Sequence, residues 1–103
     1  MPLTHPGYLI GNFTVTDPAL LAEYSRQAQP LVEQYGGSMM LSDKSFSPVE
    51  GRAEAVFVII AFPTLERATS FYNSPEYAPV KELRIQATEG GFLALTAVPV
   101  ALA

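Results

Sequence analysis

Apolar residues recur along this chain with two different spacings, and these spacings predict where strands and helices lie. Val56 to Phe62 is a run of seven residues without a polar side chain, which is typical of a strand buried on both faces. Tyr8 to Val15 is a second predicted strand, and its two sets of alternating positions are both at least partly apolar. Ser38 to Ser42 and Phe92 to Val98 are predicted to be two further strands.

The first predicted helix follows the first strand and has a clear start signal. Asp17 is expected to cap it, and Pro18 takes the first helical position, where its missing N–H costs nothing. Pro30 lies inside the pattern and should bend or divide the helix near Gln29. Gly36-Gly37 ends it. The apolar stripe of this helix has three- and four-residue spacing: Leu20, Leu21, Tyr24, Ala28, Leu31, Val32 and Tyr35.

The second helical region has two parts. A helix over Leu65 to Tyr72 follows the third strand, and Ser74-Pro75-Glu76 signals the start of another helical piece. Pro79 is expected to separate or tighten the turn that contains Tyr77. Gly90-Gly91 is then expected to close the helix. The apolar face of that helix, with one charged residue at its border, is Val80, Leu83, Arg84 and Ala87.

The order strand, helix, strand therefore occurs twice, over residues 8 to 42 and 55 to 98. Two such units, joined by the polar loop Asp43 to Arg52, predict an α+β fold of the ferredoxin-like βαββαβ type, with a four-stranded antiparallel sheet and its helices on one face. The strands are apolar on both faces, and a monomer rarely exposes more than about 600 Å² of contiguous apolar surface. We therefore expect a homodimer in which the open sheet faces meet.

Composition narrows the class of protein. The 103 residues predict a single domain over residues 1 to 103. Only 16% of the residues are charged, and the net charge of −4 argues against nucleic acid as a partner. The chain has no cysteine, which excludes disulfides and thiol chemistry. It has neither a run of about 20 apolar residues for a membrane span nor a signal peptide, so a cytoplasmic protein without membrane contact is expected.

One combination of residues resembles the family known as domain of unknown function 1330, and the resemblance extends over nearly the whole chain. The most specific part is the segment Ser74-Pro75-Glu76-Tyr77 with Arg84 seven residues after its tyrosine. The other matching positions are Tyr8, Val15 to Pro18, Tyr24, Gly36-Gly37, Glu50-Gly51, Phe62-Pro63, Ala68 and Phe71-Tyr72. The chain departs from the family pattern over Asp43 to Val49, where related chains often have a turn containing Gly or Arg.

This resemblance implies a dimeric α+β barrel of ferredoxin-like subunits. The same superfamily contains cofactor-independent monooxygenases, muconolactone isomerases and dye-decolourising or chlorite-degrading haem enzymes. The family itself implies no agreed reaction.

The residues with candidate chemistry lie on the predicted helices of both units and in the polar loop. Arg84 could hold an anionic or carbonyl-bearing ligand over the sheet, although a surface arginine or an ion pair with Glu50 would look the same in sequence. Tyr24, Tyr72 and Tyr77 could line the same cleft, although tyrosines at helical spacing are more often core rings. Glu50 could act as a general base if it is buried near Arg84, and otherwise it is a solvated loop carboxylate.

Metal and cofactor sites are not predicted. His5 is the only histidine and lies in the proline-containing arm from Met1 to Gly7, so neither a histidine-rich metal site nor a haem ligand near the cleft is expected. Both glycine pairs follow predicted helices, whereas phosphate-binding loops precede them, and we interpret these pairs as caps.

Two hypotheses for function remain. The first is a small dimeric protein that binds a small organic molecule between helices and sheet, and acts as a cofactor-independent enzyme of monooxygenase or isomerase type; in it Arg84, Tyr77 and Tyr24 orient the ligand and Glu50 moves a proton. The second is a non-catalytic binding or assembly module whose main property is homodimerisation. Fold analogy does not choose between them.

Overall fold

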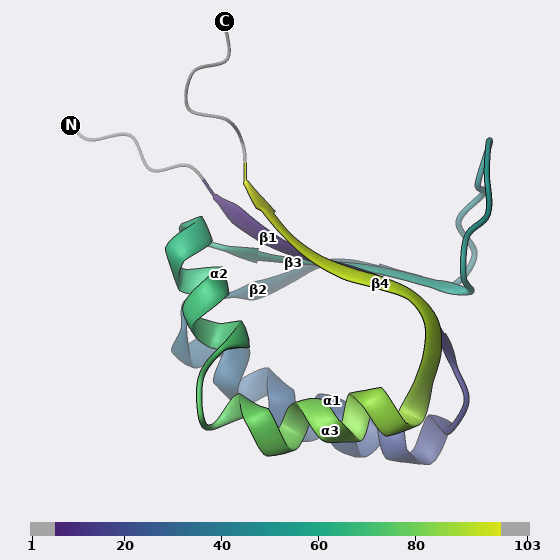
Figure 1. The fold of residues 1–103 in the computed structure, drawn as a ribbon. Helices are drawn as coiled ribbons and strands as arrows, with labels where there is room; N and C mark the ends of the chain where they lie inside the picture. Colours follow the sequence, from purple (N-terminus) through teal and green to yellow (C-terminus); the bar gives the residue numbers. More distant parts are fainter. Residues whose placement is uncertain (1–5, 98–103) are drawn as a thin grey trace, which may run out of the picture.

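A computed structural model of the protein describes residues 6–97. The helices all lie on one side of a four-stranded antiparallel sheet, whose strand order is β2-β3-β1-β4 (Figure 1). The elements are β1 (Gly7–Val15), α1 (Pro18–Gln34), β2 (Ser38–Asp43), β3 (Val56–Phe62), α2 (Leu65–Tyr72), α3 (Tyr77–Ala87) and β4 (Thr88–Ala97). This is the predicted ferredoxin-like βαββαβ fold. The expectations for the arm through His5, for Val98 and for the tail Pro99 to Ala103 concern residues outside the described range.

The predicted limits of the first helix are confirmed. The Asp17 side chain accepts a hydrogen bond from the Leu20 N–H at 3.1 Å, and Pro18 takes the first helical position. After the C-cap residue Tyr35, Gly36 has a φ of 82°, in the left-handed region where glycine is favoured. The cap and the turn therefore follow from local sequence.

Pro30 does not divide α1, which runs without a break from Pro18 to Gln34. A proline cannot donate to the carbonyl four residues earlier, which belongs to Arg26. Both Arg26 and Pro30 are exposed, so water can satisfy that carbonyl. The helix therefore tolerates the proline on its wet side.

The start of α3 differs from the prediction. Pro79 was expected to set the turn at Tyr77 apart, but α3 begins at Tyr77 and continues to Ala87. Pro79 is the third helical residue, and an N–H at that position has no partner within the helix, so nothing is lost. Ser74 stabilises the start of α3. Its side-chain oxygen and its backbone oxygen both accept a hydrogen bond from the Tyr77 N–H, each at 3.2 Å.

The prediction that Gly90-Gly91 caps the last helix is wrong. The helix ends at Ala87, and β4 begins at the next residue, four residues before the predicted start. Gly90 and Gly91 have φ values of 74° and 68° inside this strand, where its register against β1 shifts between Asn12 and Thr14. A Cβ on Gly91 would lie 1.8 Å from the Asn12 carbonyl oxygen. The pair therefore forms an irregularity in the strand that lets two backbones approach closely.

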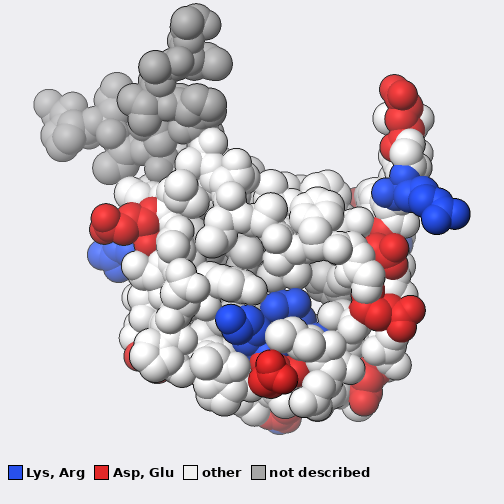
Figure 2. Space-filling view, viewed as in Figure 1, with Lys and Arg blue, Asp and Glu red and all other residues white. Residues whose placement is uncertain are grey.

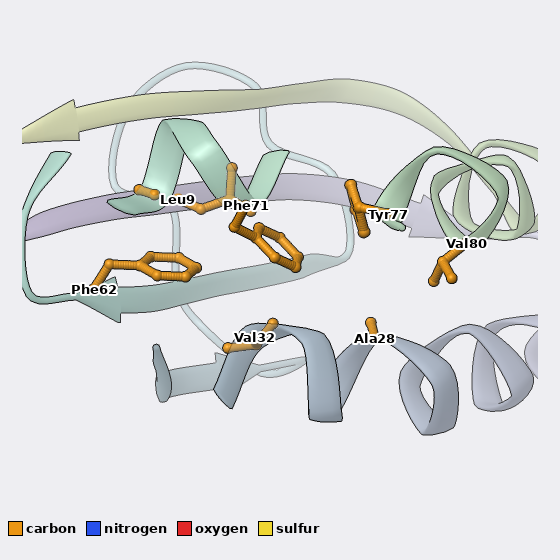
Figure 3. Close-up of a cluster of buried hydrophobic side chains, with 8 residues drawn as sticks. Leu9, Ala28, Val32, Phe62, Phe71, Tyr77 and Val80 are labelled. Atoms are coloured by element: carbon orange, nitrogen blue, oxygen red, sulfur yellow. The ribbon is translucent and has the colours of Figure 1, made fainter. Parts of the chain in front are cut away.

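The core lies between the helices and one face of the sheet (Figure 3). Odd-numbered residues of β1, such as Leu9, face the helices, and α2 packs against the sheet. Phe71 and Tyr77 are fully buried, with ring centroids 4.5 Å apart. The buried cluster consists of Leu9, Ala28, Val32, Phe62, Ala68, Phe71, Tyr77 and Val80.

The opposite face of the sheet, which we call the open face, carries no helix (Figure 1). The register of the strands places the side chains of Ile10, Ile59 and Ala94 together there, and their neighbours are largely apolar as well. Phe92 on this face is 54% exposed. The prediction that both faces of the strands are apolar is therefore confirmed.

The polar loop between β2 and β3 extends away from the sheet on the side opposite the helices (Figure 1). Asn12, buried in β1, fixes the end of this loop. Its side-chain nitrogen donates to the backbone oxygens of Glu54 and Val56 at 3.2 and 2.8 Å, and its oxygen accepts from the Glu54 N–H at 3.0 Å. The loop is thus anchored at one end to the central strand.

Candidate ligand-binding cavity

The packing of α1 leaves space beneath the sheet. This helix packs mainly against α3 and contacts the strands less closely, because Tyr24 and Leu21 stand between them. The result is a cavity of about 260 Å³. Its lining is Leu9, Gly11, Phe13, Val15, Leu21, Tyr24, Ser25, Met39, Ser42, Lys44, Val56, Val58, Ile60, Arg84 and Leu93.

The cavity continues into a second hollow of about 400 Å³ along α1 and the edge of β2. The two share Tyr24, Ser25, Met39 and Ile60 in their linings. Met39 is 57% exposed, so the opening lies at this edge of the sheet. A small molecule can therefore enter between α1 and β2 and reach the interior.

Arg84 is the buried charge of this cavity. It lies in the last turn of α3 and is 9% exposed, and its Nε atom is buried without a hydrogen-bond partner. No carboxylate of residues 6–97 forms an ion pair with it. In Figure 2, basic side chains emerge near the middle of the visible face, with an acidic side chain just below them and further charged side chains on the projecting loop. A buried cation without a counterion is costly unless something binds it.

The guanidinium stays positively charged. Burial lowers the pKa of Arg84, but the hydroxyl of Tyr77, and beyond it those of Tyr24 and Tyr72, outweigh this, so the pKa lies above its ordinary value. Arginine in any case does not deprotonate in proteins under ordinary conditions. The cavity therefore offers a fixed positive charge.

Tyr24 and Tyr77 form a hydrogen-bonded pair beside Arg84. Their hydroxyl oxygens are 2.8 Å apart, and their rings meet edge to face with centroids 6.3 Å apart. Burial raises the pKa of Tyr24 well above its ordinary value, Tyr77 raises it further, and Arg84 opposes this without cancelling it. Tyr24 is therefore a neutral hydroxyl at physiological pH.

The structure brings some of the predicted residues together and not others. Arg84 and Tyr24 line the cavity. Tyr77 is fully buried behind Tyr24 and does not line it. Tyr72 does not line the cavity either. Its ring centroid lies 5.8 Å from that of Tyr77, and the Lys81 ammonium lies 4.4 Å from the Tyr72 ring centroid. These two tyrosines support the site from behind.

Glu50 does not lie beside Arg84, so the condition for its role as a general base is not met. It is exposed on the loop that extends from the open face, whereas the cavity lies on the helix side of the sheet (Figure 1). Within the described residues, neither a carboxylate nor an imidazole lines the cavity that contains Arg84, and Glu33 lines only the second hollow. The sequence does not show on which side of the sheet the loop from Asp43 to Arg52 lies. The pairing of Glu50 with Arg84 therefore could not be decided from the sequence.

Sequence reasoning missed Ser25, Ser42 and Lys44, which line the outer part of the cavity. The register of β2 against β3 shifts between Met39 and Leu41, so simple alternation does not show which residues face the helices. The apolar stripe of α1 also omits Ser25, which lies next to Tyr24. Only the positions of the neighbouring elements reveal these residues.

Other kinds of site find no support within residues 6–97. No three His, Cys, Asp or Glu side chains of this range gather as a metal site would require. None of the helices in this range is long and apolar enough to cross a membrane.

Comparison with known proteins gives a family and a fold. The family model described as "Domain of unknown function (DUF1330)" matches residues 6–98. Among curated proteins, none matches this sequence.

Three solved structures share the fold at low sequence identity. The RPA0582 protein of unknown function from Rhodopseudomonas palustris, in methylated form, is 16% identical with a TM-score of 0.74, over 98% of this chain and 86% of that chain. SnoaB, a cofactor-independent oxygenase from Streptomyces nogalater, is 13% identical with a TM-score of 0.63, over 95% and 97%. A dimeric protein of unknown function with a ferredoxin-like fold from Bacteroides fragilis is 10% identical with a TM-score of 0.58, over 90% and 96%.

Proposed function

The chain belongs to the DUF1330 family, and from that premise we propose that it binds a small organic molecule, anionic or carbonyl-bearing, in the cavity beneath its sheet. The observation that carries this proposal is Arg84, a buried cation with an unpartnered Nε in an otherwise largely apolar cavity. An unsatisfied buried donor is uncommon in native proteins and calls for an explanation, and a ligand that supplies the missing acceptor is one. Tyr24 adds a hydroxyl beside it.

Binding is better supported than catalysis by proton transfer. A general base must lie within hydrogen-bond reach of the proton that it removes, and no carboxylate or imidazole of residues 6–97 lines the cavity beside Arg84, since Glu33 lies in the second hollow. SnoaB is a cofactor-independent oxygenase of similar fold, which keeps the hypothesis of a cofactor-independent enzyme open. Such a reaction in this cavity would have to begin from a ligand that does not need a protein base.

A thermal-shift screen tests the binding proposal. Small aromatic acids and lactones are added to the wild type, to Arg84→Met and to Arg67→Met, which changes an exposed arginine of α2. A ligand that binds the folded state raises the melting temperature by mass action, so we expect shifts in the wild type and in Arg67→Met but not in Arg84→Met. Equal shifts in all three proteins would refute a role for Arg84. No shift with any compound would favour the assembly module.

We also propose that two chains associate through their open faces. The support is the apolar character of that face, with Ile10 and Ile59 near its centre and Phe92 54% exposed, together with the B. fragilis protein of similar fold, which is dimeric. Ile59→Lys should convert a dimer to a monomer in light scattering, because a charge at the centre of the interface would be desolvated. Ile85→Lys, at an exposed position of α3, is the matched control. A wild-type mass of one subunit would contradict this part of the proposal.

A further inference from the structure

The inner end of the cavity presents hydrogen-bond donors only. Arg84 has five N–H groups and no acceptor, and its Nε–H lacks a partner. The second polar group there is the Tyr24 hydroxyl, which can donate or accept. Which of these Tyr24 does depends on the direction of its hydrogen bond with Tyr77.

That direction follows from the surroundings of Tyr77. The Tyr77 side chain is fully buried, so the proton of its hydroxyl needs an acceptor inside the protein. Within residues 6–97 the acceptor on hand is the Tyr24 oxygen, 2.8 Å away. If Tyr24 donated to Tyr77 instead, the Tyr77 proton would be buried without a partner. The Tyr77 hydroxyl therefore donates to the Tyr24 oxygen, which leaves the Tyr24 proton free.

We infer that the ligand is a carboxylate or an equivalent oxyanion, held by two donors, the Arg84 guanidinium and the Tyr24 hydroxyl, with an apolar body against the walls of the cavity. This inference rests on the proposed function and selects the anion from the two ligand classes named there. A carboxylate has two oxygens that accept only, which matches two donors and no acceptor. The carbonyl oxygen of an amide or a ketone can accept from the same donors, but it carries no charge to pair with the guanidinium, and the protons of an amide, an amine or an alcohol find no acceptor at this end.

The body of the ligand is limited by the rest of the lining. Leu9, Phe13, Ile60 and Leu93 leave no polar partner beside the charged end. Ser25 and Ser42, both exposed, lie at the outer part, so further polar atoms are tolerated only at the far end. The cavity of about 260 Å³ lies just below the usual range for drug-sized ligands, so a small acid fills it and a longer one extends into the adjoining hollow of about 400 Å³.

Calorimetry with matched pairs of compounds tests the inference. The probes are benzoate, phenylacetate and hexanoate, each compared with its primary amide and with the methyl ketone of the same length. We expect the acids to bind at least about tenfold more tightly than their amides, because the amide loses a charge-assisted hydrogen bond and opposes a donor. Acids that bind no better than their amides, or do not bind at all, would overturn the inference.

Tyr24→Phe separates the second donor from the first. It keeps the ring and should weaken binding of the acids by about tenfold to a hundredfold while leaving the weaker binding of the ketones within a few-fold. Tyr35→Phe, at the C-cap of the same helix, is the matched control, because the Tyr35 ring packs against Phe71 and does not line the cavity. Urea unfolding confirms that each variant is folded.

Failure of this inference is distinguishable from failure of the proposed function. If the ketones bind the wild type as tightly as the acids do, and lose this binding in Arg84→Met, then the cavity binds ligands but does not select anions. If acid binding is lost in Arg84→Met but unchanged in Tyr24→Phe, the tyrosine donor is wrong. If no probe of either kind binds, both are overturned.

Discussion

Replacing Arg84 with methionine is expected to leave the ligand-free protein as stable as the wild type or more stable, although the residue is 9% exposed. Replacing a buried side chain that supports the fold lowers stability, whereas replacing one that serves ligand binding does not. Methionine has a similar length and fills the same space beside Val80 and Ala87 without a charge.

The magnitude follows from the contacts of Arg84. An unpartnered buried polar group costs about 1–3 kcal/mol, and the Nε–H is such a group. The variant regains that amount and loses the contact between the guanidinium and the Tyr77 hydroxyl, about 0.5–1.5 kcal/mol. Exchange of buried charged groups for apolar ones is often neutral or stabilising. We expect a net change in the free energy of unfolding between about −0.5 and +2.5 kcal/mol.

Urea denaturation followed by circular dichroism, at one protein concentration because of the proposed dimer, measures this change. Arg67→Met should stay within about 0.5 kcal/mol of the wild type, as exposed substitutions do. Val80→Ala, which truncates a buried residue on the same helix, should lose about 1–3 kcal/mol. If Arg84→Met is destabilised as much as Val80→Ala, then Arg84 supports the fold, and the argument for a ligand loses its basis.

Three further outcomes are expected. Gly91→Ala should destabilise the protein by about 2 kcal/mol more than Gly51→Ala in urea denaturation, since both have positive φ but only the Gly91 Cβ would clash with the Asn12 carbonyl; equal losses would contradict this. Asn12→Ala should cost at least about 2 kcal/mol by the same measurement, because the carbonyls of Glu54 and Val56 lose their donor. The pKa of Tyr24 is raised above its ordinary 10.0, so the stability that this group contributes is complete below pH 10 and falls above it, by up to about 1.4 kcal/mol per pH unit. The wild type should therefore lose stability above pH 10 more steeply than Tyr24→Phe. Parallel curves for the two proteins would refute the shift.

The sequence by itself determined the elements and their order. Asp17-Pro18 and Gly36 act within a few residues of themselves, so the start and end of α1 follow from local hydrogen bonding and backbone conformation. The apolar run Val56 to Phe62 predicts a central strand, and the structure places it between β2 and β1. Periodicity also placed Arg84 on the inner border of its helix, where it is buried.

Other features depended on which segments meet in space. Gly90-Gly91 follows a helix in sequence, but glycine is required there because the Asn12 backbone of the neighbouring strand lies too close for a side chain on Gly91. Likewise Glu50 has no local signal for the side of the sheet on which its loop lies. Contacts between residues far apart in the chain decide both, and no short window of sequence contains them.

The candidate site shows the same division. The sequence supplied a cation and three tyrosines, but the packing of α1 against α3 created the cavity, and the burial of Tyr77 set the direction of its hydrogen bond. Tyr24 and Tyr77 are 53 residues apart and meet at 2.8 Å. Residue types fix which chemistry is available, whereas only the tertiary structure decides which groups are desolvated together and therefore what they bind.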